Sequence, residues 1–228
     1  MKKIWITGSL LSLGLWSLAQ QKQGSVVYER TSQVRFNIAD NNNGEESKVQ
    51  TRTDKFDLSF GNNQSLWRQA EKENDDNENI SNNGVQIRMI VAGSDDVLYH
   101  NFSDAKKTEL RVFFDRKFII DDSIRPLKWK MGEETKTILN HVCRKATATN
   151  TSKRTTMNIE NGVMERKEID DTSRITAWFA TDIPVAAGPA EFQGQLPGLI
   201  LALDINNGKQ VYQAMSISEK SDLASIKA

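Results

Sequence analysis

The 228-residue sequence has a single cysteine, Cys143, and only two histidines, His100 and His141. One cysteine cannot form an internal disulfide, so the fold must depend on its apolar core. Two histidines leave most hydrolytic machinery without its usual general base. The sequence also lacks a nucleophile elbow, a His-Glu-x-x-His motif, a phosphate-binding loop and a dinucleotide fingerprint. We therefore expect a protein that is not an enzyme and that needs no cofactor.

An excess of charge of either sign is missing too, since 30 basic residues balance 30 acidic ones. Without a basic stripe, we do not expect nucleic acid as a partner. The apolar run at residues 4–18 is shorter than the roughly 20 residues of a spanning helix. It follows two lysines and ends in Ser17-Leu18-Ala19, which is typical of a secretory signal peptide cleaved after residue 19. No cysteine follows, so we expect a periplasmic or secreted protein that is not a lipoprotein and keeps no transmembrane segment.

The sequence does contain repeated alternation of apolar and polar residues, for example at 56–60 and 110–114. A period of two predicts strands, so we expect a mainly β fold built on an antiparallel sheet with little helix. A short helix is expected only at 218–227. Asp121-Asp122 and Asp170-Asp171 fit turns better than a calcium site, because neither has EF-hand spacing.

Residues 20–228 are expected to form one domain, because no linker or fixed-period repeat divides them. Two segments, at 40–46 and 71–84, are rich in Asn, Asp and Glu and poor in apolar residues. Such segments bury little surface, which predicts polar loops.

Three of the four prolines lie in a glycine-containing segment near the C-terminus. Its Ala177-Trp178-Phe179, Asp182-Ile183-Pro184, Gly188-Pro189 and Leu196-Pro197-Gly198-Leu199-Ile200-Leu201 resemble the GLPGLI family of exported Bacteroidetes proteins, which has no established activity. Gln195 stands where that family has its first glycine. The resemblance implies an exported protein with a single curved antiparallel sheet, similar to the half-barrel of periplasmic lipoprotein carriers.

This C-terminal segment also holds the candidate ligand-binding residues. A rigid frame with large apolar side chains suits an apolar ligand. The candidates are Trp178, Phe179, Phe192, Leu196, Pro197, Gly198, Leu199 and Ile200. The alternative is a chain reversal that feeds a buried strand at 199–205, with Pro and Gly fixed by turn geometry.

His141, Cys143 and Lys145 fall on one face of a predicted strand. A His/Cys pair offers two soft ligands to copper or zinc, and a nearby base can activate a thiol. Two ligands do not complete a metal site, so a buried structural cysteine is the favoured interpretation of Cys143.

Our leading hypothesis is an envelope protein that binds a lipid, an acyl chain or a hydrophobic peptide in the concavity of a curved sheet. The alternative is an interaction or structural module that docks on an envelope protein through a sheet edge or its polar loops. A metal- or thiol-dependent enzyme using His141 and Cys143 is the third hypothesis.

Overall fold

The computed structural model describes residues 22–39, 45–70, 79–82, 85–88, 96–113, 116–160 and 163–226. The expected signal peptide at 1–19 lies outside the described residues, as do 40–44, 71–78 and 83–84 of the two expected polar loops. The described parts of those loops are strands: residues 45–46 begin β2, and 79–82 form β4.

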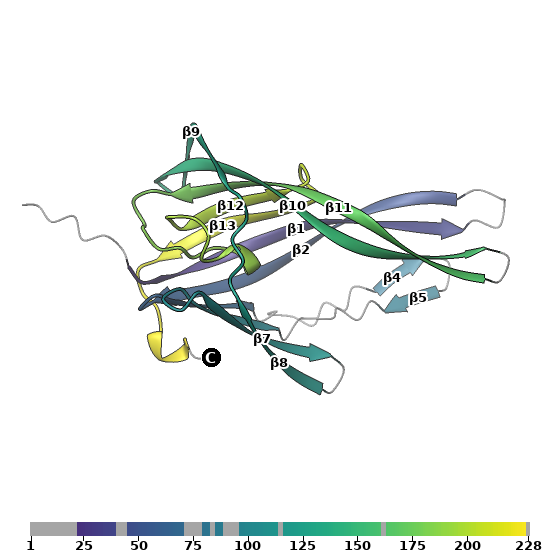
Figure 1. Ribbon diagram of the computed structural model, residues 1–228, viewed down its shortest axis with the longest axis horizontal. Helices are drawn as coiled ribbons and strands as arrows, with labels where there is room; N and C mark the ends of the chain where they lie inside the picture. Colours follow the sequence, from purple (N-terminus) through teal and green to yellow (C-terminus); the bar gives the residue numbers. More distant parts are fainter. Residues whose placement is uncertain are drawn as a thin grey trace, which may run out of the picture.

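Eleven strands form one antiparallel sheet, which confirms the predicted fold class (Figure 1). Their order across the sheet is β8-β7-β6-β3-β2-β1-β13-β12-β11-β10-β9. Their bounds are β1 (Gly24–Ala39), β2 (Glu45–Gly61), β3 (Gln64–Gln69), β6 (Val97–Asn101), β7 (Lys106–Phe113), β8 (Arg116–Ser123), β9 (Lys130–Ile138), β10 (His141–Glu160), β11 (Val163–Ala180), β12 (Ile200–Ile205) and β13 (Gln210–Ser218). A separate hairpin pairs β4 (Asn79–Asn82) with β5 (Val85–Arg88).

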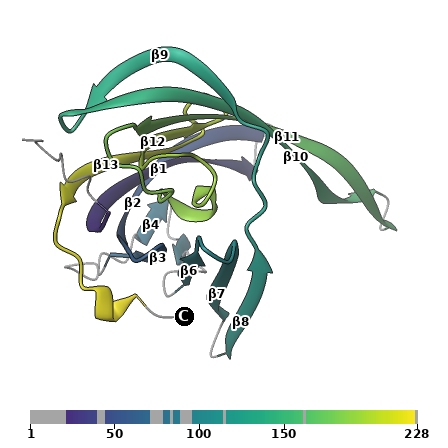
Figure 2. The same ribbon diagram turned by 60° about the vertical axis from the view of Figure 1, so that its left-hand side comes forward.

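The sheet curves strongly but does not close into a barrel, so β8 and β9 remain its two edges (Figure 2). The described residues contain two 3-10 turns, η1 (Ala190–Phe192) and η2 (Leu223–Ser225), and no α-helix. The short helix expected at 218–227 is therefore wrong for the described residues, where only η2 forms. No helix of the described chain has the length and apolar character needed to cross a bilayer.

Residues 181–199 connect β11 to β12 and lie inside the curve of the sheet, where Figure 2 shows η1. Backbone hydrogen bonds fold this segment back on itself, from Leu199 N–H to the Ile183 carbonyl and from Gly194 N–H to the Ala186 carbonyl. The fully buried Tyr28 hydroxyl donates to the Ile200 carbonyl. The segment thus fills much of the inner side of the sheet with the protein's own residues.

The turns expected at Asp121-Asp122 and Asp170-Asp171 are wrong, because both pairs lie within strands, β8 and β11. Partners on the neighbouring strands offset the low strand preference of aspartate. Asp121 lies opposite Thr108, whose hydroxyl donates to its carboxylate at 2.7 Å. Asp170 lies opposite Lys153 of β10.

Candidate ligand-binding site

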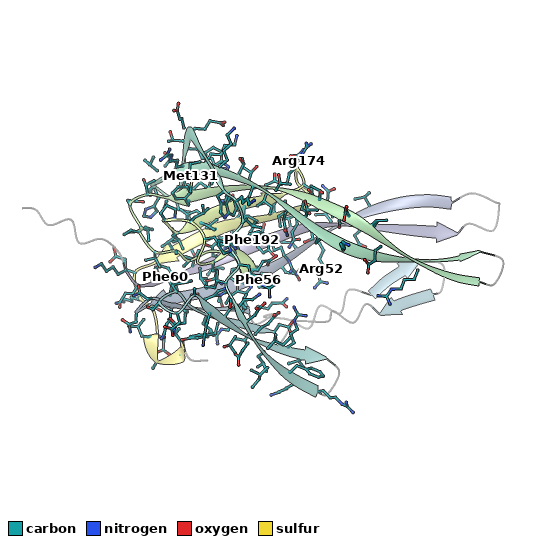
Figure 3. The ribbon with its side chains drawn as sticks, viewed as in Figure 1. Arg52, Phe56, Phe60, Met131, Arg174 and Phe192 are labelled. Carbon is teal, nitrogen blue, oxygen red and sulfur yellow. The ribbon has the colours of Figure 1, made fainter. Side chains whose placement is uncertain are left out.

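Most of the apolar residues predicted to bind a ligand lie in the protein core. Phe179, Phe192, Leu196, Leu199 and Ile200 are all at most 4% exposed. Gly198 is pressed against the backbone of β11, where an added Cβ would clash with the Ala180 carbonyl oxygen. Pro197 is exposed. Of the whole set, only Phe192 lines a described cavity. Figure 3 labels Phe192 among the side chains in the middle of the view.

Trp178 belongs to a different environment from the rest of the set. It alternates along β11 with the buried Ala177 and Phe179, so its side chain lies on the opposite face of the sheet. There the Lys136 ammonium lies 4.4 Å from the centroid of its ring, and the Lys145 ammonium 5.9 Å away. The structure therefore does not bring Trp178 together with Phe192.

An aromatic cluster from three strands forms the floor of a hollow of about 440 Å³ on the inner side of the sheet. Trp67 of β3 stacks on Phe56 of β2, with ring centroids 4.9 Å apart, and lies edge-on to Tyr212 of β13 at 6.0 Å. Leu98 and Ala190 complete its apolar lining. We call this hollow the aromatic chamber; its volume is in the range of small-molecule sites.

Charged side chains line the rest of the aromatic chamber: Arg30, Glu109 and Arg111 take part in ion pairs, whereas Asp96, Lys107 and Glu191 form none with the described residues. Arg30 contacts Asp54 at 2.7 Å, and Arg111 contacts Glu109 at 2.7 Å. Burial alone would raise the pKa of Asp54, but hydrogen bonds from Arg30 and Arg52 lower it below its ordinary value. Asp54 is thus held as a carboxylate that Arg30 and Arg52 share.

Lys107 differs from these two arginines. It lines the aromatic chamber, and among the described residues no carboxylate lies within ion-pair distance of its ammonium. A cation without an ion-pair partner on the wall of a hollow is an attachment point for an anion, because a charge-assisted hydrogen bond is stronger than a neutral one.

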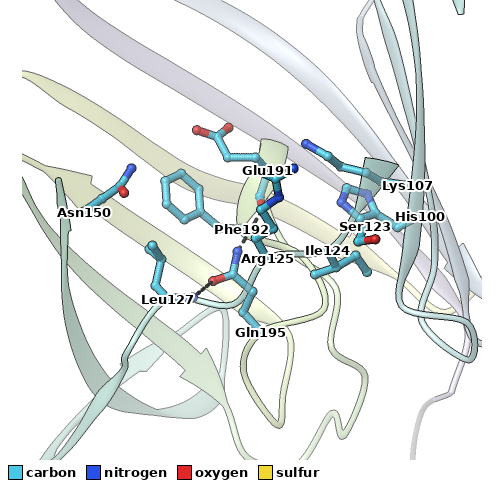
Figure 4. Close-up of a pocket in the computed structure, with 10 residues that line it drawn as sticks. All are labelled: His100, Lys107, Ser123, Ile124, Arg125, Leu127, Asn150, Glu191, Phe192 and Gln195. Carbon is cyan, nitrogen blue, oxygen red and sulfur yellow. Dashed lines mark hydrogen bonds between the residues drawn. The ribbon is translucent and has the colours of Figure 1, made fainter. Parts of the chain in front are cut away.

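A second hollow, of about 230 Å³, adjoins the first, since Lys107 and Glu191 line both (Figure 4). We call it the His100 chamber. His100 of β6 lies opposite Lys107 of β7 and is fully buried. Neither of its ring nitrogens has a hydrogen-bond partner among the described residues. Burial and the nearby Lys107 lower the pKa of His100 to about 4, so the ring is neutral at pH 7.

A neutral imidazole has one nitrogen that donates and one that accepts a hydrogen bond. Leaving both unpaired in the interior costs free energy, so buried polar groups in folded proteins are nearly always paired. His100 therefore has an unused donor and an unused acceptor beside a hollow, next to an unpaired ammonium. This combination suits an acidic ligand group.

Gln195 holds one wall of the His100 chamber in place. Its side-chain oxygen accepts hydrogen bonds from Leu127 N–H and from the indole of Trp129, both at 3.0 Å. Its amide nitrogen donates to the Glu191 carbonyl at 2.9 Å. One side chain thus joins the connection between β8 and β9 to η1 (Figure 4).

We expect the Gln195→Gly protein to lose about 2 kcal/mol of unfolding free energy, because three hydrogen bonds, two of them part-buried and one exposed, disappear. Urea titration measures the loss. Gln195→Ala is the matched variant, since it removes the same hydrogen bonds without adding glycine's backbone freedom. A Gln195→Ala protein as stable as the original would contradict this role for the amide.

Cys143 and His141 lie in different surroundings in this structure. The Cys143 thiol is buried, and burial together with the charge of Asp182 raises its pKa to about 11, so it stays protonated at neutral pH. His141 Nδ1 lies 2.7 Å from the Asp182 carboxylate. Within the described ranges, no three His, Cys, Asp or Glu side chains are grouped to hold a metal ion.

Sequence reasoning did not select Phe56, Trp67, Lys107 or Tyr212, and it considered His100 only as a histidine distant from His141. The alternation at 56–60 predicted that Phe56 belongs to a core face. Nothing local in the sequence indicates that β2, β3 and β13 bring Phe56, Trp67 and Tyr212 together, because their register is set by long-range pairing.

A family model described as a protein of unknown function (Porph_ging) matches residues 129–202. This range extends from the start of β9 into β12 and includes η1 and Gln195. No curated protein matches the chain. Among solved structures, one of PNGF-II is similar, with 17% identity and a TM-score of 0.49, over 87% of this chain and 28% of that one. The chain thus spans less than a third of the length of PNGF-II, and membership of the GLPGLI family stays a prediction.

Proposed function

We propose that the protein is an exported, non-enzymatic binding protein whose ligand is a small amphipathic acid with an acyl body. The body lies over the aromatic floor formed by Phe56, Trp67 and Tyr212. The acidic group lies at Lys107, where the two chambers meet. The observation that carries the proposal is the position of the Lys107 ammonium, which lines both the aromatic chamber and the His100 chamber. In the His100 chamber, neither ring nitrogen of His100 has a hydrogen-bond partner among the described residues.

The floor offers an apolar body the exposed parts of three rigid aromatic rings, which are 7% (Phe56), 6% (Trp67) and 4% (Tyr212) exposed. The volume of the aromatic chamber, about 440 Å³, suits one chain or part of one and is small for a complete two-chain lipid. A single acyl chain is therefore the best match among the lipid, acyl chain and peptide ligands that the sequence left open.

The charges around the hollow support an acid as the polar end of the ligand. Arg111 pairs with Glu109, and Arg30 shares Asp54 with Arg52, so Lys107 is the described cation on these walls that has no carboxylate of the described chain within ion-pair distance. His100, neutral at pH 7, can add a hydrogen bond through its donor nitrogen. A neutral ester would lose the ionic contact with Lys107.

We expect the residue 20–228 protein to bind dansyl-labelled undecanoic acid at pH 7, and Lys107→Ala to weaken this binding about tenfold, the effect of one charge-assisted hydrogen bond. Fluorescence titration measures the affinity. Lys106→Ala is the matched control, since Lys106 is an exposed lysine on the same strand that lines neither chamber.

The methyl ester of the same probe distinguishes the contribution of the acidic group to the affinity from that of the acyl body. The ester should bind more weakly than the acid, and Lys107→Ala should not change its affinity. The proposal fails if the acid does not bind, or if Lys106→Ala and Lys107→Ala weaken it equally.

A further inference from the structure

β8 is an edge strand with apolar side chains exposed on both of its faces. Ile119 is 73% exposed, Phe118 46% and Ile120 40%. In the described chain β8 pairs with β7 alone, and the β7–β8 hairpin projects from the body in both ribbon views (Figures 1 and 2). An edge strand with an unpaired ladder and apolar side chains is a template for another strand.

The charges of β8 indicate which strand fits. The strand starts with two cations, Arg116 and Lys117, and two anions, Asp121 and Asp122, lie near its end. The apolar residues 118–120 lie between them. A strand with this pattern is complementary to itself when it runs in the opposite direction, because the cationic end of one copy then faces the anionic end of the other.

We propose that β8 pairs antiparallel with β8 of a second copy of this chain, forming a two-fold dimer centred on Ile119. In this register Arg116 lies opposite Asp122, Lys117 opposite Asp121, and Phe118 opposite Ile120 of the second copy. Residues directly opposite one another lie on the same face of an antiparallel pair, so every charged pair and the apolar pair can make contact. The two sheets join into one across the two-fold axis.

Neighbouring registers do not give this match. Moving the two-fold centre by one residue toward Ile120 places Phe118 opposite Asp122 and leaves Arg116 unmatched within β8. Moving it by one residue toward Phe118 places Arg116 opposite Ile120. The charges therefore select one register, which is how opposite charges specify strand pairing.

The contacts that Asp121 and Asp122 already make do not compete strongly with the proposed charged pairs between the two copies of β8. Asp122 pairs with Arg125 at 3.1 Å, but that pair is exposed and such pairs contribute little. Asp121 accepts a hydrogen bond from Thr108 and keeps other lone pairs for Lys117 of the second copy. An interface of one strand pair is small, so the dimer is weak and reversible.

Sedimentation velocity over a concentration series tests the pairing. The original protein should form a reversible dimer, and Lys117→Asp should raise its dissociation constant about tenfold or more, because like charges then face each other at two symmetric positions. Combining Lys117→Asp with Asp121→Lys restores the opposite charges and should restore the dimer. A monomer at every concentration, or a dimer with the same dissociation constant in all three proteins, overturns the proposal.

Cross-linking tests the register. Ile119→Cys places two cysteines directly opposite each other across the axis and should give a disulfide-linked dimer under mild oxidation. In Ile120→Cys the two cysteines lie diagonally, at about 7–8 Å, and should cross-link far less. The native Cys143 is buried and does not interfere. Equal cross-linking of the two variants, or cross-linking of Ile120→Cys alone, contradicts this register.

Discussion

Gly198→Ala is expected to lower the unfolding free energy by about 3 kcal/mol or more, the largest effect we expect from a methyl group added at one of the glycines whose surroundings the structure describes. The added Cβ would overlap the Ala180 carbonyl oxygen and would lie 3.1 Å from the Phe179 ring. Overpacking of side chains typically costs about 1–3 kcal/mol. Here the obstacle is backbone, which cannot rotate away as a side chain can.

The surrounding hydrogen bonds explain why the backbone cannot yield. Ala180 N–H donates to the Leu199 carbonyl at 2.8 Å, and Leu199 N–H donates to the Ile183 carbonyl at 3.0 Å. Moving Gly198 away from Ala180 would stretch the first of these bonds and displace Leu199, which is fully buried. The clash must therefore break packing or hydrogen bonds that the core depends on.

Gly132→Ala is the control for the Gly198 prediction. Gly132 lies in edge strand β9, and the nearest atom to an added Cβ there is 3.4 Å away, an ordinary contact. The unfolding free energy of the Gly132→Ala protein should differ from that of the original protein by less than about 1 kcal/mol. Urea titrations of both variants measure the contrast. If Gly198→Ala unfolds at the same urea concentration as Gly132→Ala, the close approach to Ala180 is not what requires glycine.

The Gly198 contact also explains what the proline- and glycine-rich segment does in the fold. The prediction that this segment leads into a buried strand is confirmed, since β12 begins at Ile200. Periodicity cannot show which side of a sheet such a segment covers. In the structure it packs inside the curve, so Leu196, Leu199 and Ile200 are core, and the hollows lie beside the segment rather than within it.

Local patterns predicted the strands but not their neighbours. Alternation at 56–60 predicted the strand that contains Phe56, and its pairing with β1 and β3 brought Trp67 against it. The error at Asp121-Asp122 has the same origin, because an aspartate pair suggests a turn until its cross-strand partners are known. The residues of the chambers come from β1, β2, β3, β6, β7, β8, β10, β13, η1 and connecting segments, so they depend on this long-range pairing.

Acid is expected to destabilise the protein through His100. The pKa of this ring is lowered from 6.5 to about 4 by burial and by Lys107. Between these two values the unfolded chain binds a proton that the folded protein does not, so the unfolding free energy falls as the pH falls. Relative to pH 7, a pKa shift of this size lowers the unfolding free energy by about 2 kcal/mol at pH 5 and by about 3 kcal/mol at pH 4.

His100→Phe isolates this contribution, because phenylalanine keeps a ring beside Phe102, where His100 now stacks at 6.2 Å, and does not titrate. Urea titrations at pH 7 and pH 4 measure how much unfolding free energy each protein loses on acidification. This loss should be about 3 kcal/mol smaller in His100→Phe than in the original protein. Asp54 and the other carboxylates titrate in both proteins and cancel in the comparison. Equal losses in the two proteins would mean that the imidazole is hydrogen-bonded or hydrated in solution. That result would also remove the unsatisfied donor on which the His100 chamber depends as a place for an acidic group.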